Sequence, residues 1–308
     1  MRLVDGDSSS VRSLYHEDYY GAMAPANCEY FCKHRGAALL PNRLKGLARV
    51  KLEPGMTVLD VGCGRGELCI YCALRGLNAV GVDFASTAIA IGQELIEQFQ
   101  IRSRTVSYVS LICADGCRLP FDDESFDRIM SFAFLEHIEL WQAELFVDEA
   151  KRVLRPNGVL VICTGPNELP IRLAHGVFRP FANWLLHSKL PNYSDRIATE
   201  RSGGHLHLWN PFSLQRLLAK YSMPCYVRTF ADDYAAYPSL ASNVRRIGSR
   251  INCLSPFLAN DMWAIAAKSQ HALRKFVAKE DCFVPQALLH KTDGEVLRST
   301  AGDQSQPD

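Results

Sequence analysis

The sequence predicts an α/β fold in which helices pack on a mostly parallel β-sheet. From about residue 56 to residue 163, short apolar runs alternate with longer amphipathic ones, which is the pattern of βαβ units. A glycine-rich loop follows the first apolar run, and Arg155-Pro156-Asn157-Gly158 is a turn signal that ends the last helical stretch. We expect strands at Thr57–Val61, Ala79–Val82, Val106–Cys113, Phe126–Ser131 and Val159–Cys163, with helices at Glu67–Arg75, Ser86–Gln100 and Gln142–Leu154 between them.

The segment 166–208 interrupts this alternation. It carries no clear strand and is rich in aromatic, arginine and histidine residues. Such a segment is typical of a lid over a substrate, and equally of a small helical subdomain with its own core. A helix lying on a membrane surface is a weaker alternative, because the stretch is not strongly basic. The residues that fit an amphipathic helix here are Phe178, Phe181, Trp184, Leu185 and Leu186.

The whole chain divides into five expected parts. Two late strands, Tyr226–Phe230 and Met262–Ala267, return the chain to the sheet after the insertion, and the last residues are polar. The expected parts are an N-terminal helical cap at 1–50, a core at 51–165, a substrate lid at 166–208, the remainder of the core at 209–280 and a flexible tail at 281–308.

Composition excludes several classes of protein. The formal net charge is +1, so the basic excess of a dedicated nucleic-acid binder is missing. No apolar run reaches the roughly 18–20 residues that span a membrane. The first ten residues are polar and acidic, unlike a secretory signal. We therefore expect a cytoplasmic protein with reduced cysteines, no nucleic-acid partner and no membrane span.

The strongest motif is the run Val58-Leu59-Asp60-Val61-Gly62-Cys63-Gly64-Arg65-Gly66-Glu67. A buried strand enters three glycines at alternate positions and then a helix. Glycines there let a ligand approach the backbone closely, and the helix N-terminus attracts a carboxylate or phosphate. The spacing Gly-x-Gly-x-Gly differs from the Gly-x-Gly-x-x-Gly of dinucleotide folds. A purely structural turn is the alternative.

Two acidic residues follow the second and third predicted strands. Asp83 lies where a carboxylate can accept hydrogen bonds from both hydroxyls of a ribose. Asp115 lies where a carboxylate can accept a hydrogen bond from an adenine amino group, and dehydrogenases do not ordinarily place an acid there. The alternatives are a helix cap for Asp83 and a solvated loop residue for Asp115.

Together these residues resemble the class I S-adenosylmethionine-dependent methyltransferases, and most closely their small-molecule group, which includes quinone-biosynthesis enzymes. The resemblance rests on Val58 to Gly66, Asp83, the segment Asp115 to Ile138 with Phe134-Leu135-Glu136-His137-Ile138, and Leu154-Arg155-Pro156-Asn157-Gly158. It covers about residues 35–165 well and 205–268 loosely. It implies a Rossmann-like three-layer sandwich whose seven-stranded sheet has an antiparallel final strand.

The same resemblance implies S-adenosyl-L-methionine as the cofactor and S-adenosyl-L-homocysteine as its product. It also implies a role for particular residues. The implied cofactor-binding set is Asp60, with Gly62, Gly64 and Gly66 at the methionine part, Asp83 at the ribose, Phe84 beside the adenine, Asp115 and Gly116 at the adenine amine, and Ser131 and Phe132 near the sulfonium.

Methyl transfer needs mainly a positioned acceptor and excluded water, and a base helps when the acceptor is a hydroxyl or a protonated amine. His137 is the first candidate base, although with Glu136 it could simply brace the following helix. His205 and His207 alternate on one face of an extended segment, where they could bracket an acceptor or bind a metal. No third metal ligand is evident, so no metal site is predicted. Tyr20, from the cap, is the third polar group expected near the acceptor.

Two cysteine pairs have spacings that superficially suggest a metal site. These are Cys28-x-x-x-Cys32-x-His34 and Cys69-x-x-Cys72. The first lacks a partner cluster and the second lies inside a predicted helix, so ordinary thiols are favoured for both.

The sequence thus predicts a biosynthetic methyltransferase acting on oxygen or nitrogen of a small-molecule metabolite. The alternative among enzymes is a C-methyltransferase acting on a quinone- or lipid-like acceptor. The alternative outside enzymes is a regulatory module that binds S-adenosylmethionine. An NAD-dependent oxidoreductase shares the first strand, loop and helix but does not explain Asp115. The expected partner is the acceptor, and a homodimer is left open.

Overall fold

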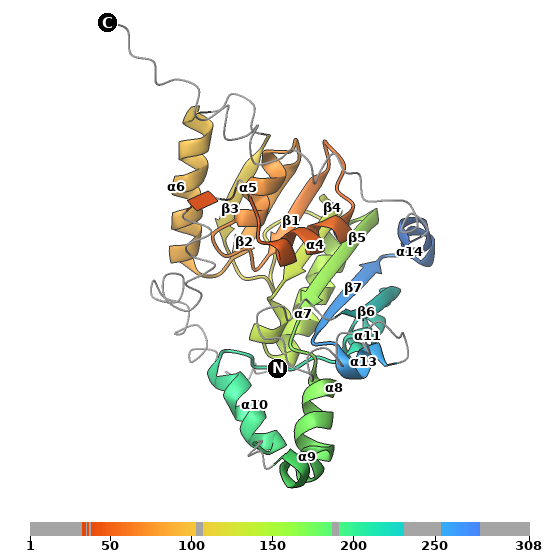
Figure 1. Ribbon diagram of the computed structural model, residues 1–308. Coiled ribbons are helices and arrows are strands. Elements are labelled where there is room, and N and C mark those ends of the chain that lie inside the picture. Colours follow the sequence, from red (N-terminus) through yellow and green to blue (C-terminus); the bar gives the residue numbers. More distant parts are fainter. Residues whose placement is uncertain are drawn as a thin grey trace, which may run out of the picture.

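Seven β-strands form one sheet, and helices cover both of its faces (Figure 1). The computed structural model describes residues 33–34, 36, 38–102, 107–186, 191–230 and 254–277. The predicted tail at 281–308 and most of the predicted cap, including Tyr20, lie outside the described residues.

The strand order in the sheet is β3-β2-β1-β4-β5-β7-β6. Strands β1 to β5 pair in parallel, and β7 is antiparallel to both of its neighbours, β5 and β6. This arrangement confirms the predicted Rossmann-like fold, and it pairs the two late strands although they are far apart in sequence. The strands are β1 Thr57–Val61, β2 Asn78–Asp83, β3 Val109–Cys113, β4 Phe126–Phe132, β5 Leu154–Thr164, β6 Cys225–Phe230 and β7 Asp261–Ala267.

The sheet is buried on both faces, so its central strands are almost continuously apolar. Along β1, successive side chains alternate between the two faces. Val58 packs with one set of helices, whereas Leu59 and Val61 pack with the other. The first set is α4 Pro41–Val50, α5 Glu67–Ala73, α6 Ser86–Arg102 and α14 Gln270–Val277, and the second is α7 Leu140–Val153 and α11 Pro211–Lys220.

Strands β1 and β4 lie side by side at the centre of the sheet, and the chain leaves them in opposite directions. From β1 it continues to β2, and from β4 it continues to β5 on the other side. A parallel sheet with such a switch has a crevice at the carboxyl ends of these strands, where ligands bind. The fold therefore places the glycine loop, Asp83 and the segment after β4 around one crevice.

The turn signal after α7 is accommodated differently from the prediction. Helix α7 ends at Val153 as expected, but β5 begins at once and includes residues 155–158. Phe126 pairs with Leu154 and Arg128 with Val159, so these four residues lie opposite the single residue Asp127. The proline–asparagine–glycine sequence thus forms a bulge in the strand.

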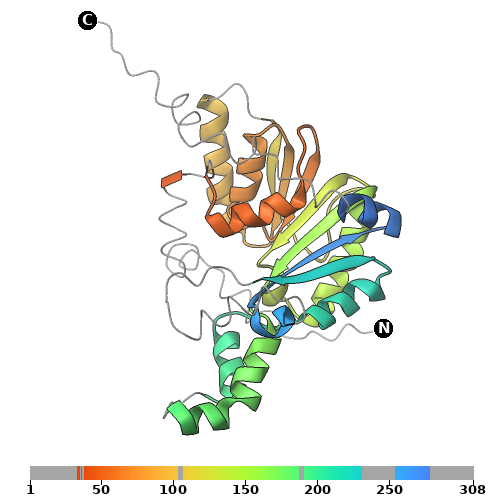
Figure 2. The ribbon, with the colours of Figure 1, turned by 45° about the vertical axis from the view of Figure 1, so that its right-hand side comes forward.

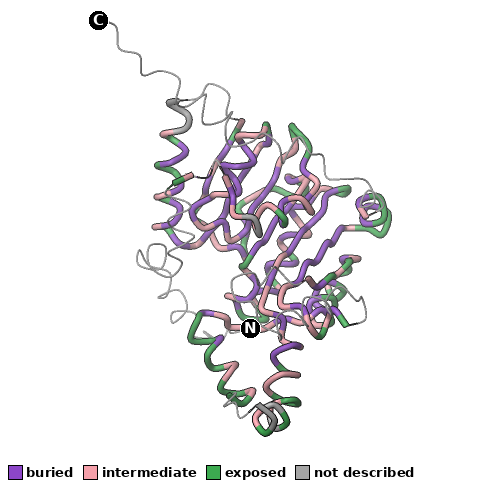
Figure 3. Tube along the Cα trace, in the orientation of Figure 1, coloured by how far each residue is buried: buried purple, intermediate pink, exposed green. Residues whose placement is uncertain are grey.

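Residues 166–208 form a helical arm. It consists of α8 Glu168–Ile171, a π-helix at Arg172–Val177, α9 Arg179–Leu186 and α10 Tyr193–Ser202. These helices project from the body in both views, and much of their surface is exposed (Figures 1, 2 and 3). At the base of the arm, the buried side chain of Asn167 donates hydrogen bonds to the carbonyls of Pro256 and Ala259. Both lie at α13 Ser255–Leu258.

Among the described residues, no helix has both the length and the apolar character that crossing a bilayer requires.

Candidate functional site

A small pocket lies at the carboxyl ends of β1, β2 and β3. Five of the ten residues predicted to bind the cofactor line it together, although they come from three different loops. They are joined by side chains from the segment after β4 and from α7. The predicted residues are Gly62, Asp83, Phe84, Asp115 and Gly116, and the others are Val82, Cys117, Phe134, Ile138 and Gln142.

Gly62 shapes one wall of this pocket. Its φ of +77° is one that residues with a Cβ rarely adopt. A Cβ on Gly62 would lie 2.7 Å from Cδ2 of Phe134, which also lines the pocket. The Phe134 ring is held in turn by an edge-to-face contact with Phe146, at 5.4 Å between ring centroids. Glycine is therefore required here both by the backbone and by the ring that covers it.

Asp83 ties the glycine loop to the end of β2. Its Oδ2 accepts a hydrogen bond of 2.8 Å from the Gly64 N–H, and its Oδ1 accepts one of 2.9 Å from the Ala85 N–H. Burial raises the pKa of Asp83, and these backbone bonds oppose the shift. A carboxylate offers about four lone-pair sites, so two bonds leave capacity for hydroxyl groups of a ligand.

Asp115 and Gly116 form the opposite wall. Asp115 Oδ1 accepts a hydrogen bond of 2.9 Å from the Cys117 N–H, which closes a tight turn after β3. A Cβ on Gly116 would lie 2.7 Å from Cγ1 of Val61, so the backbone there approaches the end of β1 closely. Both acids thus stand at strand ends within the same pocket, as an adenosyl group would require.

The other five predicted cofactor residues are not among the residues that line this pocket. Gly64 and Gly66 lie in the loop behind it, and Asp60 is buried in β1. The Phe132 ring packs edge-on against Trp263 in the core, at 5.2 Å between centroids. Ser131 is fully buried at the end of β4, and its Oγ has no hydrogen-bond partner among the described residues. Their contact with a cofactor stays a prediction.

Two charged residues that the sequence did not mark for the cofactor lie beside this site. Arg43 reaches from α4 to the end of β4, where it donates a hydrogen bond of 3.3 Å to the Phe132 carbonyl. Burial raises the pKa values of both Asp60 and Glu136 to about 7, and the charge of Arg43 opposes both shifts. Glu136 also accepts a hydrogen bond of 2.8 Å from the Thr164 hydroxyl.

The arm brings His205 to His137. Their ring centroids are 5.2 Å apart, and His137 Nδ1 lies 3.0 Å from the Gly204 carbonyl. Because a carbonyl only accepts, Nδ1 carries the proton in that bond. Burial lowers the pKa of His137 to about 4, so its ring is neutral at pH 7. Phe134 and Ile138 both line the pocket, and His137 lies between them in the chain.

His205 is held by a carboxylate from the arm itself. Its Nδ1 lies 2.6 Å from Oε2 of Glu200, which is buried in α10. The other oxygen of Glu200 forms an ion pair with Arg196. We call Glu200, His205 and His137 the histidine cluster. His207 is not part of it, since its ring packs on Trp209 at 4.4 Å between centroids.

The described part of the chain contains no group of three or more His, Cys, Asp or Glu side chains that could hold a metal ion. Cys69 and Cys72 are fully buried within the core on the α5 face. Burial raises the pKa of both thiols, which keeps them protonated. Cys28 and Cys32 lie outside the described residues.

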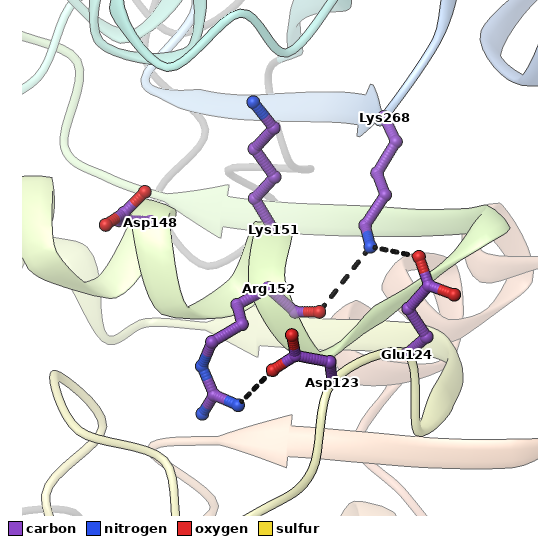
Figure 4. A pocket seen from close by; sticks show the side chains of 6 residues that line it. All are labelled: Asp123, Glu124, Asp148, Lys151, Arg152 and Lys268. Atoms are coloured by element: carbon purple, nitrogen blue, oxygen red, sulfur yellow. Dashed lines mark hydrogen bonds and ion pairs between the residues drawn. The ribbon is translucent and has the colours of Figure 1, made fainter.

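A second, wider depression lies at the amino end of β4, on the edge of the sheet opposite the glycine loop (Figure 4). Its charged side chains pair with one another. Lys268 Nζ contacts Glu124 Oε1 at 3.2 Å, and Arg152 contacts Asp123 at 2.8 Å. Acidic and basic groups are mixed, so the depression shows no preference for a charged ligand.

The raised pKa of Glu136 predicts a pH dependence of stability. An acid whose pKa rises from 4.5 to about 7 on folding binds more protons in the folded state between those values. Its contribution to the free energy of unfolding therefore falls as pH rises across that interval. We expect the free energy of unfolding of the wild type minus that of Glu136→Gln, measured by urea titration, to decrease between these values and to level off above them.

The lowered pKa of His137 predicts the opposite pH dependence of the free energy of unfolding. Its pKa falls from 6.5 to about 4 on folding, so its contribution to stability rises with pH across that interval. The same subtraction with His137→Asn is expected to increase. Equal slopes for the two variants would contradict both assignments.

The strand order, the switch between β1 and β4 and the paired acids in one pocket define a nucleoside-binding α/β domain. Residues 59–162 match the family model described as a methyltransferase domain. A Mycobacterium tuberculosis protein described as a probable S-adenosylmethionine-dependent methyltransferase is 35% identical over 122 residues, which cover 39% of this chain and 40% of that protein.

Two further relatives have named acceptors. A demethylmenaquinone methyltransferase of Clavibacter sepedonicus is 33% identical over 110 residues, covering 35% of this chain and 41% of its own length. A 27-O-demethylrifamycin SV methyltransferase of Amycolatopsis mediterranei is 32% identical over 127 residues, covering 40% and 43%. The chain thus spans less than half the length of these relatives.

Among solved structures, geranyl diphosphate C-methyltransferase from Streptomyces coelicolor superimposes with a TM-score of 0.53 over 85% of this chain and 88% of that chain. The sequence identity is 13%, so the likeness concerns the fold alone. The family match, the relatives and the fold agree. Residues 59–162 therefore form a methyltransferase domain like that of S-adenosylmethionine-dependent methyltransferases, within a fold shared with class I enzymes of this kind.

Proposed function

We propose that the protein transfers a methyl group from S-adenosylmethionine to an oxygen or nitrogen atom of a small-molecule metabolite. The observation that carries the choice of acceptor is the histidine cluster beside the cofactor pocket. Hydroxyl and ammonium acceptors lose a proton on methylation, and His205 with Glu200 is built to take one.

The residues of the pocket fit the adenosyl part of the cofactor. Asp83 would accept the ribose hydroxyls and Asp115 the adenine amine, because both stand at strand ends in one pocket. The absence of a Cβ at Gly62 lets the Phe134 ring pack directly on the backbone, where both residues form a wall for the ligand. When bound, S-adenosylmethionine supplies a methyl group already activated on a sulfonium. The protein then has to orient the acceptor, exclude water and accept a proton.

Glu200 sets the state of His205. A carboxylate only accepts hydrogen bonds, so His205 Nδ1 donates at the 2.6 Å contact, and Nε2 is the ring nitrogen left to face an acceptor. Nε2 is therefore the atom that removes the acceptor proton, and Glu200 stabilises the imidazolium that results. His137 stays neutral beside it, so it adds no opposing positive charge.

Acceptor recognition is assigned to the parts outside the cofactor pocket. We propose that the cap at 1–50 and the arm at 166–208 enclose the acceptor over the core at 51–165 and 209–280. The histidine cluster supports the role of the arm, since Glu200 and His205 both belong to it. Tyr20 is proposed as a third polar group from the cap.

One observation favours a second candidate, C-methylation of a quinone- or lipid-like acceptor. The tip of the arm carries exposed aromatic side chains, and one relative is named for demethylmenaquinone. The test for both candidates is the protein incubated with S-adenosylmethionine carrying an isotope-labelled methyl group and a fractionated metabolite extract. NMR of the labelled product then shows whether the methyl group is bonded to oxygen, nitrogen or carbon.

Calorimetry together with the labelling experiment separates an enzyme from a module that only binds the cofactor. Calorimetry that detects S-adenosylmethionine and S-adenosylhomocysteine but not NAD would establish the cofactor. Binding without any labelled product in all fractions would contradict the proposed catalysis and leave the regulatory module.

Asp83→Ala is expected to weaken S-adenosylhomocysteine binding by about 1–3 kcal/mol, the usual loss for a charged hydrogen-bond partner. The variant removes the acceptor for the ribose and also the bond that holds Gly64. Calorimetric titration measures the change. Asp127→Ala is the matched control, because Asp127 also accepts a backbone N–H, from Thr57, but at the amino end of β4. Equal affinities of Asp83→Ala and wild type would refute the ribose assignment.

A further inference from the structure

The tip of the arm carries an exposed apolar face. Four large side chains, Val177, Phe178, Phe181 and Trp184, are between 56% and 73% exposed, with Trp184 the most exposed. Figure 3 shows the end of the arm as exposed surface. Single exposed apolar residues are ordinary, but four neighbours of this size form a continuous patch. We call these four residues the tip face.

The tip face lies on one side of the helix. Phe178, Phe181 and Trp184 are spaced three residues apart, and Val177 precedes Phe181 by four residues, which places them on one face of α9 and the turn before it. The Phe181 and Trp184 rings are 6.1 Å apart between centroids. The sequence left two interpretations of these aromatic residues, a lid over a substrate or the core of a small subdomain, and in the structure their side chains are exposed.

The base of the arm is firmly attached, so the exposure belongs to the tip. The Trp209 indole N–H donates a hydrogen bond of 3.1 Å to the Leu135 carbonyl, and Asn210 binds Glu168 at 2.9 Å. Together with the Asn167 bonds to the α13 segment, these contacts hold both ends of the arm on the body.

The charge around the tip face indicates what could cover it. Asp and Glu account for 33 of the 308 residues, yet none occurs between Arg172 and Asp195. The same stretch contains Arg179 and Lys189. The chain has another exposed tryptophan, Trp141, which is 54% exposed but follows Glu139 in sequence and lies near further acids on α7. The stretch of sequence that carries the tip face thus contains basic but no acidic residues, whereas the stretch around Trp141 contains several acids.

We infer that the tip face docks on a lipid bilayer with anionic head groups. Tryptophan and phenylalanine favour the membrane interface, and basic residues such as Arg179 in the same stretch of sequence attract anionic lipid. A second copy of the chain fits less well, since two such tips would carry like charges. Docking would hold the tip of the arm at the membrane surface. The inference concerns location and does not depend on the acceptor.

The experiment is co-flotation of the full-length protein with vesicles of phosphatidylcholine alone or mixed with phosphatidylglycerol. We expect binding to the mixed vesicles, and loss of at least about tenfold in affinity for Phe181→Ala/Trp184→Ala and for Arg179→Glu. Trp141→Ala is the matched control and is expected to bind like wild type. All variants should bind S-adenosylhomocysteine normally, which separates this result from any failure of the proposed function.

Three outcomes would overturn the inference. The first is no binding of the wild type to mixed vesicles. The second is that Phe181→Ala/Trp184→Ala binds the mixed vesicles as tightly as the wild type does, or that the wild type binds phosphatidylcholine vesicles as tightly as the mixed ones. The third is a wild-type dimer in sedimentation that Phe181→Ala/Trp184→Ala converts to a monomer, since the occupant would then be a second copy.

Discussion

Replacing His205 with alanine is expected to lower kcat by about 10²–10⁴-fold, the usual contribution of a positioned general base. Nε2 of His205 is the atom assigned to remove the acceptor proton, and the loss of its ring leaves Glu200 without its 2.6 Å partner. The measurement is transfer of labelled methyl groups to the acceptor fraction found in the extract. S-adenosylhomocysteine affinity should stay within about twofold of wild type, because His205 does not line the cofactor pocket.

Glu200→Gln tests the positioning role separately. Glutamine keeps the shape but cannot stabilise the imidazolium, so kcat should fall less than in His205→Ala and the pH profile should shift. Glu168→Gln is the matched control on the same arm, since Glu168 accepts hydrogen bonds from Arg172, Tyr193 and Asn210 and contacts neither His205 nor His137. If Glu200→Gln and Glu168→Gln gave the same rates and pH profiles, Glu200 would have only a structural role.

Gly62→Ala is expected to abolish measurable S-adenosylhomocysteine binding and to cost about 2–4 kcal/mol of stability. The added Cβ meets a backbone φ of +77° and lies 2.7 Å from the Phe134 ring, whose neighbours Val82 and Ile138 line the same pocket. Relief of this contact must move either the ring or the loop into the space for the ligand. Calorimetry and urea unfolding measure the two effects.

Gly55→Ala separates backbone strain from the contact with the ring. Gly55 has a φ of +86°, and a Cβ there would have nothing within 4 Å. This variant should lose only the cost of a left-handed backbone, about 1–2 kcal/mol, and keep its ligand affinity. Equal behaviour of the two variants would mean that the Phe134 contact has no part in binding.

The pocket proposed for the cofactor could be predicted because its residues follow strands that are recognisable locally in the sequence. Gly62, Asp83 and Asp115 each follow a strand that its apolar pattern identifies, and the carboxyl ends of parallel strands meet at one edge. The order of the strands then brings these three residues into one pocket without any further information. The predicted strand ends agree with the structure to within a few residues for the same reason.

The acceptor side could not be predicted in the same way, because it depends on tertiary contacts. The Glu200–His205 pair forms only because the chain turns at Gly203 and Gly204, where Gly204 has a φ of +92°. Arg43 reaches the end of β4 from a helix whose orientation no local pattern specifies. His205 and His207 look equivalent in sequence, but in the structure His205 contacts Glu200 and His137, whereas His207 packs on Trp209.

The hydrogen bond between His137 and the Gly204 carbonyl joins the arm to the body. If the arm lifts, that bond breaks and water reaches the ring, so the pKa of His137 returns from about 4 toward 6.5. The lifted form then binds one more proton between these values, and by linkage acidification favours it. Opening of the arm is thus coupled to proton uptake. Amide exchange in residues 193–205 should be faster at about pH 5 than at about pH 7.5 after correction for intrinsic rates, and His137→Asn should remove the difference.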